Sequence, residues 1–345
     1  MTLAPESTAM FREAQEAADR IEAQIAANAD VIGGLAQRLR ATPPRFVVTC
    51  ARGSSDHAAT FAKYVFETEL GFATASASPS VSSVYAAPLK LEGALFVAIS
   101  QSGKSPDLVR SAEGARQAGA HVVALVNTPD SPLAAAADTV IPLHAGPELS
   151  VAATKSYLCS LSAIVQIAAE WKNDANLRAA LADVPGAMRA AWACDWTPLV
   201  EGLADARNLF VLGRGLGLAA AQEAALKFKE TSGLHAEGFS SAEVKHGPMA
   251  LVGPDFPVLA FGQDDDTLAG TLAVAEEFRR RGAKVFLAAP GDPPGSNLPL
   301  GEKLHPVCAP LIAVRQFYRA VNALAVRRGH NPDVPPHLNK VTETV

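Results

Sequence analysis

The stretch Ala94-Leu-Phe-Val-Ala-Ile-Ser-Gln-Ser-Gly-Lys-Ser-Pro106 determines the expected fold, because an apolar run passes directly into a polar loop. The apolar run predicts a buried strand. Pro106 suits the first position of a helix, and Ser105 suits the residue that caps it. The stretch therefore predicts a strand, a loop and a helix in that order.

The loop of this stretch gathers backbone N–H groups and the hydroxyls of Ser100, Ser102 and Ser105. The positive end of the helix dipole faces the same point, which favours an anion and most of all a phosphate. An ordinary corner between strand and helix, in which the serines only cap, fits the local pattern equally well. The loop alone leaves both interpretations open.

The chain contains a related pattern twice. Phe46-Val-Val-Thr-Cys-Ala-Arg52-Gly53 is matched by Phe210-Val-Leu-Gly-Arg214-Gly215, and Gly119-Ala-His-Val-Val is matched by Gly282-Ala-Lys-Val-Phe. The offsets are 162 and 163 residues, which predicts a duplicated domain. Each copy alternates β-branched runs with Ala-rich stretches, as expected for a parallel sheet covered by helices on both faces.

Helices are expected around and between the copies. Residues 7–39 predict one or two helices that end before Pro43-Pro44, and residues 311–328 predict a helix that ends at Gly329. Residues 153–191 also read as helical, with a break near Pro185. The predicted division is a helical segment over 1–42, domains over 43–192 and 193–330, and a tail over 331–345, of a kind that is usually disordered.

Composition excludes several classes of protein. The net charge of −5 over 345 residues disfavours a general nucleic-acid or anionic-membrane binder, and no apolar run is long enough to span a membrane. The start of the chain lacks a signal-peptide pattern. Cys50, Cys159, Cys194 and Cys308 are scattered, so they predict buried thiols in a reducing cytoplasm.

The two copies differ where chemistry is expected. The second copy has Asp264-Asp-Asp266 where the first has its serine loop, and carboxylates repel a phosphate. It also has a helix over 218–232 that places Glu223, Lys227 and Glu230 on one face. A solvated charged stripe is the common meaning of that spacing. Here the helix is otherwise Ala-rich, and acidic, basic and imidazole groups follow it over 235–248, so a carboxylate base and a histidine acid are expected together.

Cofactor and metal motifs are missing from the sequence. The third glycine of Gly213-x-Gly215-x-Gly217 comes one residue too early for a dinucleotide fingerprint, and there is no Walker A sequence. No group of His, Cys and Asp has the spacing of metal ligands. We therefore expect neither a cofactor nor a metal.

Several motifs together resemble the sugar isomerase (SIS) family, and specifically the isomerase half of glucosamine-6-phosphate synthase. The motifs are Arg52-Gly-Ser-Ser-Asp56, Ser100-Gln-Ser-Gly-Lys-Ser105, Glu148-Leu-Ser-Val-Ala-Ala-Thr-Lys155, Ala225-Leu-Lys-Phe-Lys-Glu230, His235-Ala-Glu237, Glu243-Val-Lys-His-Gly-Pro248 and residues 333–342. Each motif is weak alone, but their joint order is specific. The resemblance implies two tandem SIS domains, each a flavodoxin-like α-β-α sandwich.

The resemblance also implies roles for residues. Glu230 would move a proton between C1 and C2 of the sugar, with Glu223 and Lys227 beside it. His246 would assist ring opening from a neighbouring subunit, and Lys340 would contact or condense with the open-chain carbonyl. The residues that would bind the phosphate or the sugar are Gly53, Ser54, Ser55, Ser100, Gln101, Ser102, Ser105, Val151 and Ala152.

Two departures from the family pattern limit the implied activity. Pro335-Pro-His337-Leu stands where the family commonly has Pro-Arg before its Leu-x-Lys, and the glutamine-hydrolysing half is missing. The leading hypothesis is therefore a deaminating isomerase that turns glucosamine 6-phosphate into fructose 6-phosphate and ammonia, as a cytoplasmic homodimer with a shared active site. The sequence does not separate glucosamine from galactosamine phosphate.

Two alternatives stay open. A deglycase acting on fructosamine 6-phosphate or an amino-acid–sugar conjugate would carry nearly the same motifs. A non-catalytic sugar-phosphate sensor would share the fold, but residues 1–42 are too short and too acidic for an appended DNA reader. The presence of Glu230, His246 and Lys340 also favours an enzyme over a sensor.

Overall fold

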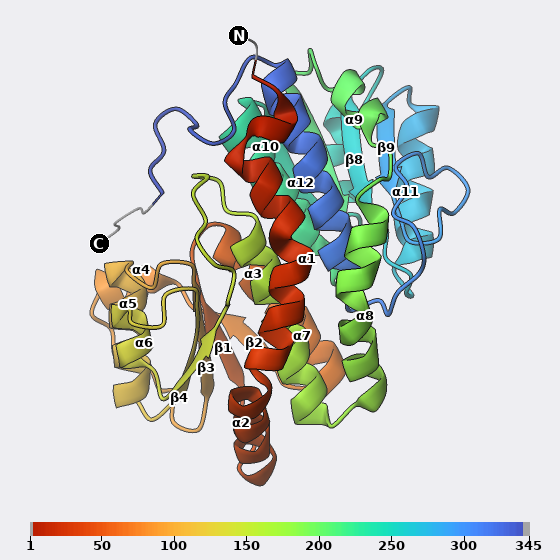
Figure 1. Ribbon diagram of the computed structural model, residues 1–345. Helices are drawn as coiled ribbons and strands as arrows, with labels where there is room; N and C mark the ends of the chain where they lie inside the picture. The colour runs from red at the N-terminus through yellow and green to blue at the C-terminus, as the bar shows by residue number, and fades with distance from the viewer. Residues whose placement is uncertain (1–2, 341–345) are drawn as a thin grey trace. The chain divides into compact units, whose positions relative to one another are not determined.

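The computed structural model describes residues 3–340 (Figure 1). The chain forms two compact units. Of the described residues, unit A comprises 19–148, 155–182 and 339–340, and unit B comprises 3–18, 149–154 and 183–338. Within residues 3–340, no helix combines the length and the apolar composition that a membrane span requires.

Unit A is built on a five-stranded parallel sheet in the order β2-β1-β3-β4-β5. Its strands are β1 (Val47–Cys50), β2 (Thr74–Ser76), β3 (Leu95–Ser100), β4 (His121–Val126) and β5 (Thr139–Pro142). The strand predicted within residues 94–100 is β3, and all six of its residues are buried. Continuous burial is expected for a parallel strand that is covered on both faces.

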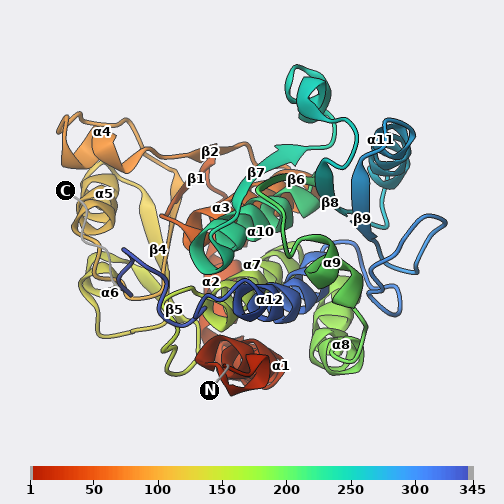
Figure 2. The same cartoon turned by 90° about the horizontal axis from the view of Figure 1, so that it is seen from above.

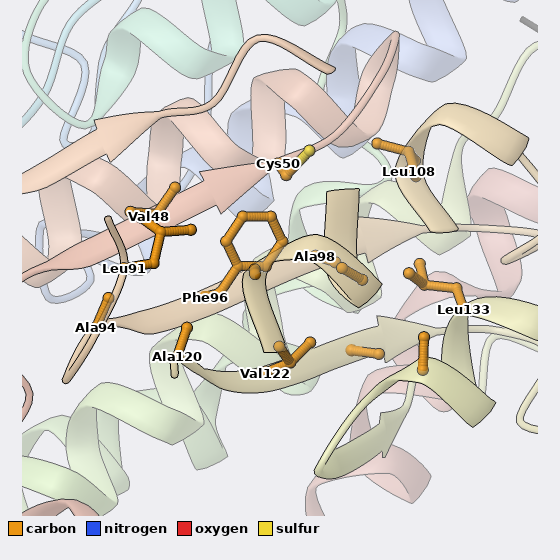
Figure 3. Packing of buried hydrophobic residues seen from close by; sticks show 14 of the residues in the cluster. Val48, Cys50, Leu91, Ala94, Phe96, Ala98, Leu108, Ala120, Val122 and Leu133 are labelled. Atoms are coloured by element: carbon orange, nitrogen blue, oxygen red, sulfur yellow. The ribbon is translucent and has the colours of Figure 1, made fainter. Parts of the chain in front are cut away.

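The helices of unit A are α2 (Ala29–Ala41), α3 (Ser54–Leu70), α4 (Pro79–Ser83), α5 (Pro106–Gln117), α6 (Pro132–Ala136) and α7 (Lys155–Lys172). One core lies between the sheet and α5 and α6. Figure 3 shows Phe96 of β3 between Val48 of β1 and Val122 of β4, with Leu108 of α5 and Leu133 of α6 packed onto the same cluster. This core fixes where the loop after β3 begins.

Unit B is built on a four-stranded parallel sheet in the order β7-β6-β8-β9. Its strands are β6 (Asn208–Gly213), β7 (His235–Ser240), β8 (Pro257–Phe261) and β9 (Lys284–Ala288). Its helices are α9 (Thr197–Gly202), α10 (Gly217–Ser232), α11 (Leu268–Arg280) and α12 (Ala309–Arg327), with short 3₁₀ turns η1 (Pro5–Ser7), η2 (Glu243–Lys245) and η3 (Pro248–Leu251). Helix α12 packs against α10 and α9.

The two sheets confirm the predicted fold class and share one topology. The first four strands of unit A and the four strands of unit B both follow the order second, first, third, fourth. Each sheet is parallel and flanked by helices (Figure 2). The sequence repeat at offsets of 162 and 163 residues therefore coincides with a structural repeat.

Two helices, α1 (Ala9–Ala27) and α8 (Ala175–Ala191), contribute residues to both units. The predicted break near Pro185 was wrong, because Pro185 lies inside α8. The helices α7 and α8 are instead separated at Asn173, which has a left-handed φ of 58°, and at Asp174, whose carboxylate accepts hydrogen bonds from Asn176 N and Leu177 N. An Asp in that position caps a new helix.

The four cysteines are free thiols. Cys50, Cys159 and Cys308 are buried as predicted, and burial raises the pKa of Cys50 to about 12. Cys194 is only half-buried, which corrects the expectation that all four lie in the core.

Candidate active site

The loops that follow β1 and β3 lie at the same edge of the unit A sheet, because these two strands are parallel neighbours. Gly53 stands between β1 and α3 with φ 55° and ψ −133°, a conformation open essentially to glycine. Ser54 and Ser55 follow as the first, half-buried residues of α3. The N-terminus of α3 therefore opens onto the same sheet edge as the loop after β3.

The loop between β3 and α5 is held by its own serines. Ser100 Oγ accepts a hydrogen bond from Gly103 N at 3.0 Å, and Ser102 Oγ accepts one from Lys104 N at 3.3 Å. The carbonyl of Gln101 accepts a bond from Asn127 N. Ser105 occupies the N-cap position of α5 as predicted, but its side chain makes no capping bond in the described structure. Its hydroxyl is therefore available to a ligand.

Gly103 is required by the shape of this loop. Its φ is +63°, and a Cβ there would lie 2.1 Å from Ser131 Oγ. Its carbonyl also accepts a hydrogen bond from Leu133 N. The loop is thus packed against the start of α6 at a point where no side chain fits.

An ion pair ties the two loops together. Arg52, the second residue after β1, donates to the buried carboxylate of Asp107 in the first turn of α5, with its Nη2 2.7 Å from Oδ2. The other oxygen of Asp107 accepts a bond from Leu108 N. Our sequence reasoning missed this pair, although Arg52 stands in a quoted motif. Its geometry fixes both serine loops relative to each other.

Helix α10 of unit B carries the charged cluster that its spacing predicted. Lys227 Nζ lies 2.5 Å from Glu230 Oε2 and 3.3 Å from Glu223 Oε1, and the side chains of Glu223 and Lys227 are fully buried. Tyr318 of α12 donates its hydroxyl to Glu223 at 2.8 Å. The stripe is therefore a buried network and not a solvated surface.

The electrostatics of this cluster hold Lys227 in its charged form. Burial by itself lowers the pKa of Lys227, but the carboxylates of Glu223 and Glu230 outweigh burial and raise that pKa to about 12. The side chain of Glu230 is 22% exposed, so it is the accessible carboxylate of the three charged groups. A carboxylate that reaches solvent is able to take and return a proton.

His246 lies elsewhere in unit B. It follows η2 in the segment between β7 and β8, which extends away from the unit B sheet in Figure 2. His246 is exposed, and so is Leu251, at 67%. Among residues 3–340, no hydrogen bond or ion pair joins His246 to Glu230 of α10.

Lys340 lies in unit A and is held by a buried carboxylate. Its Nζ is 3.0 Å from Glu148 Oε2, and Glu148 also accepts hydrogen bonds from the N–H and the hydroxyl of Ser156. The side chain of Lys340 is 26% exposed. Glu148 was only part of a quoted motif, so its pairing with the tail lysine is a finding of the structure.

Val151 and Ala152 belong to unit B. Val151 donates its backbone N–H to the carbonyl of Asp333 at 3.1 Å. Ala152 is buried. Unit A thus holds the serine loops and Lys340, and unit B holds the α10 cluster, His246, Val151 and Ala152.

Comparison with known proteins places these features in a family. Residues 43–170 and 202–289 match the family described as "SIS domain". A glutamine–fructose-6-phosphate aminotransferase (isomerizing) of Zymomonas mobilis is 32% identical over 314 residues, which cover 85% of this chain and 51% of the relative. The chain therefore spans about half the length of the curated relatives it matches.

Solved structures agree with the family match. A proposed phosphosugar isomerase of Silicibacter pomeroyi DSS-3 is 42% identical, covers 94% of this chain and 100% of its own, and superposes with a TM-score of 0.87. The C-terminal domain of a glucosamine-fructose-6-phosphate aminotransferase from Francisella tularensis is 28% identical with the same TM-score, and the match covers 95% of this chain and 98% of that one.

Proposed function

This chain belongs to the SIS domain family, and from that premise we propose that it is an amino-sugar phosphate deaminase of the isomerising type. The reaction is glucosamine 6-phosphate plus water to fructose 6-phosphate plus ammonia. The buried Glu223–Lys227–Glu230 cluster carries this proposal, because an aldose–ketose exchange needs one base that serves two adjacent carbons. The names of the relatives given above also refer to phosphosugars, the class of substrate proposed here.

The serine loops supply the phosphate site in this proposal. Ser54 and Ser55 open α3, and Ser102 and Ser105 precede α5, so hydroxyls and helix N-termini from two neighbouring strands face one anion. Gly53 and Gly103 let the backbone take the required shape. Binding energy from the phosphate, which does not react, orients the reacting carbons.

Glu230 performs the proton transfer. In the open-chain aldose its carboxylate takes the proton from C2, and the electron pair forms a C1–C2 double bond. The carbonyl oxygen at C1 gains a proton, which gives an enolamine. Glu230 then delivers that proton to C1, and the nitrogen on C2 releases a proton as it becomes an imine. Water adds to C2 and ammonia leaves, so the atoms of sugar phosphate and water are fully accounted for. Lys227 Nζ, 2.5 Å from Glu230 Oε2, lies beside the carboxyl group that carries the proton from C2 to C1.

We assign supporting roles in the reaction to His246 and Lys340. We assign ring opening to His246, which exchanges a proton with the ring oxygen, and carbonyl contact to Lys340. Because His246 is exposed on the extended segment between β7 and β8, it is free to serve a second subunit in a homodimer. Mixing His246→Ala with Glu230→Gln subunits is expected to restore part of the activity. No restoration after demonstrated subunit exchange would count against a shared site.

The direct test measures ammonia and fructose 6-phosphate from glucosamine 6-phosphate with purified protein. Equal amounts of both products are expected, and Glu230→Gln is expected to lower kcat by about 10²–10⁴-fold. Glu276→Gln is the matched control, since Glu276 also pairs with a cation at i,i+3 but is 62% exposed on α11. It is expected to leave kcat unchanged.

Other outcomes would replace the proposal. Faster turnover of fructosamine 6-phosphate conjugates than of glucosamine 6-phosphate would indicate a deglycase. Phosphosugar binding without any product, together with no effect of Glu230→Gln, would indicate a sensor.

A further inference from the structure

We propose that Asp333 is a positioning residue that anchors the catalytic tail and the sugar-facing loop over residues 149–151. The proposal rests on the proposed function, because the tail carries Lys340 and the loop carries Val151. Asp333 touches none of the residues assigned to proton transfer. It acts by fixing the two segments that present Val151 and Lys340.

The carboxylate of Asp333 caps a helix from very far along the chain. Its Oδ2 accepts a hydrogen bond from Ala9 N at 2.7 Å, and its Oδ1 accepts one from Met10 N at 2.8 Å. Both donors are in the first turn of α1. The backbone carbonyl of the same residue accepts the N–H of Val151 at 3.1 Å. One residue therefore joins the tail, the loop and the helix N-terminus.

A carboxylate that belongs to α1 itself holds the loop over residues 149–151 as well. Glu13, which is 4% exposed, accepts hydrogen bonds from the backbone N–H groups of Leu149 and Ser150. Ser150 Oγ in turn donates to the carbonyl of Pro332. Three consecutive N–H groups of the loop, from Leu149 to Val151, are therefore fixed by α1 and the tail.

The same two segments meet again at Lys340. Glu148 directly precedes the anchored loop, and its carboxylate lies 3.0 Å from Lys340 Nζ. Residues 332–340 are thus attached to residues 148–151 at both ends. Fixing both ends removes conformations in which Lys340 is out of place, and preorganisation of this kind raises the rate of the reaction rather than the affinity.

The start of α1 also has a local cap, which satisfies a different N–H group from those that Asp333 satisfies. Thr8 Oγ1 accepts a hydrogen bond from Phe11 N at 3.1 Å, as an ordinary N-cap residue does. Asp333 supplies two further bonds across 323 and 324 residues. What those bonds add is the position of the tail.

The test compares Asp333→Ala with Thr8→Ala. The second variant removes the local cap and the hydrogen bond that Thr8 Oγ1 donates to Asn322 Oδ1, but none of the bonds to the tail over residues 331–340. Ammonia release by Asp333→Ala is expected to fall in kcat by about 10-fold or more, with KM changed by less than about 3-fold, because the serine loops are untouched. Asp333→Asn, which keeps one acceptor, is expected to recover part of kcat. Thr8→Ala is expected to keep kcat.

Hydrogen exchange provides a readout that does not depend on the reaction. Peptides covering residues 148–151 and 331–340 are expected to exchange faster in Asp333→Ala than in the wild type, and not in Thr8→Ala. Unchanged exchange and unchanged kcat in a folded Asp333→Ala protein would overturn the anchor, as would equal losses of kcat in both variants. Faster exchange in a protein whose wild type releases no ammonia would retain the anchor and refute the proposed function.

Discussion

Helix α3 of unit A and helix α10 of unit B each follow the first strand of their own sheet. Each helix packs on the first, second and third strands of that sheet, counted in chain order. The offset that relates Arg52 to Arg214 also relates Phe61 to Glu223 and Val65 to Lys227. All four side chains are fully buried. The fold therefore accepts either an apolar pair or a charged pair at this place.

This comparison bears on why the charges are present. Replacing a buried ion pair with apolar residues of similar size is often neutral or stabilising. Unit A shows the apolar solution in place, so stability does not require Glu223 and Lys227. Their presence in unit B is consistent with a chemical role for Glu230, whose Oε2 lies 2.5 Å from Lys227 Nζ.

The largest expected effect comes from removing half of the charged pair. Lys227→Met leaves the buried carboxylate of Glu223 without its cation, and we expect a loss of about 3–5 kcal/mol in the free energy of unfolding, measured by urea denaturation. The double variant Glu223→Leu/Lys227→Met copies the apolar pattern of α3 and is expected to regain most of that stability while staying inactive. If the double variant were as unstable as the single one, the comparison would fail.

The next effect concerns the loop that unit B does not share. Gly103→Ala places a Cβ against Ser131 in a left-handed backbone, so we expect a loss of about 1–3 kcal/mol and weaker phosphosugar binding. Gly114→Ala, within α5 and with open space around it, serves as the control and is expected to stabilise by up to about 1 kcal/mol. Both are read by thermal unfolding with and without fructose 6-phosphate. Equal behaviour of the two variants would refute a special shape at Gly103.

The smallest expected effect on stability comes from placing a negative charge of unit B in the serine loop of unit A. The main effect of this change is expected on phosphosugar binding. Ser102→Asp introduces a carboxylate like those of residues 264–266 into the serine loop. We expect KM to rise by about tenfold or more through repulsion of the phosphate, with stability changed by less than about 0.5 kcal/mol. Ser102→Asn provides the uncharged match. A KM that rises equally in both variants would argue against phosphate at this loop.

Structural features that depend on residues close together in the sequence could be predicted from it. The buried run of β3, the helix at Pro106 and the shared face of α10 all follow from spacing within a few residues. The helix boundary at Asn173 was not predicted, because proline is the stronger helix-breaking signal in sequence and Pro185 stands in the same helical run as the turn-forming pair Asn173-Asp174.

Contacts between distant residues left no such signal. Arg52 and Asp107 are 55 residues apart, and Glu148 and Lys340 are 192 apart, so no periodicity relates them. The tail over 331–340 was expected to resemble a disordered end, yet Asp333 and Lys340 are both bonded to other segments. Residues 341 and 342, which complete the tail motif, lie outside the described residues.

The cap on α1 also constrains the order of events during synthesis. The N–H of Ala9 donates to Asp333, which is synthesised 324 residues later. At about 5–20 residues per second, a ribosome needs roughly 16–65 seconds to supply it. Nearly all of unit A is available by Ala182, whereas the first turn of α1 and the loop over 149–151 gain Asp333 only near the end of translation. For much of its synthesis the nascent chain therefore contains all five strands of unit A while Asp333, which bonds to α1 and to Val151, is still missing.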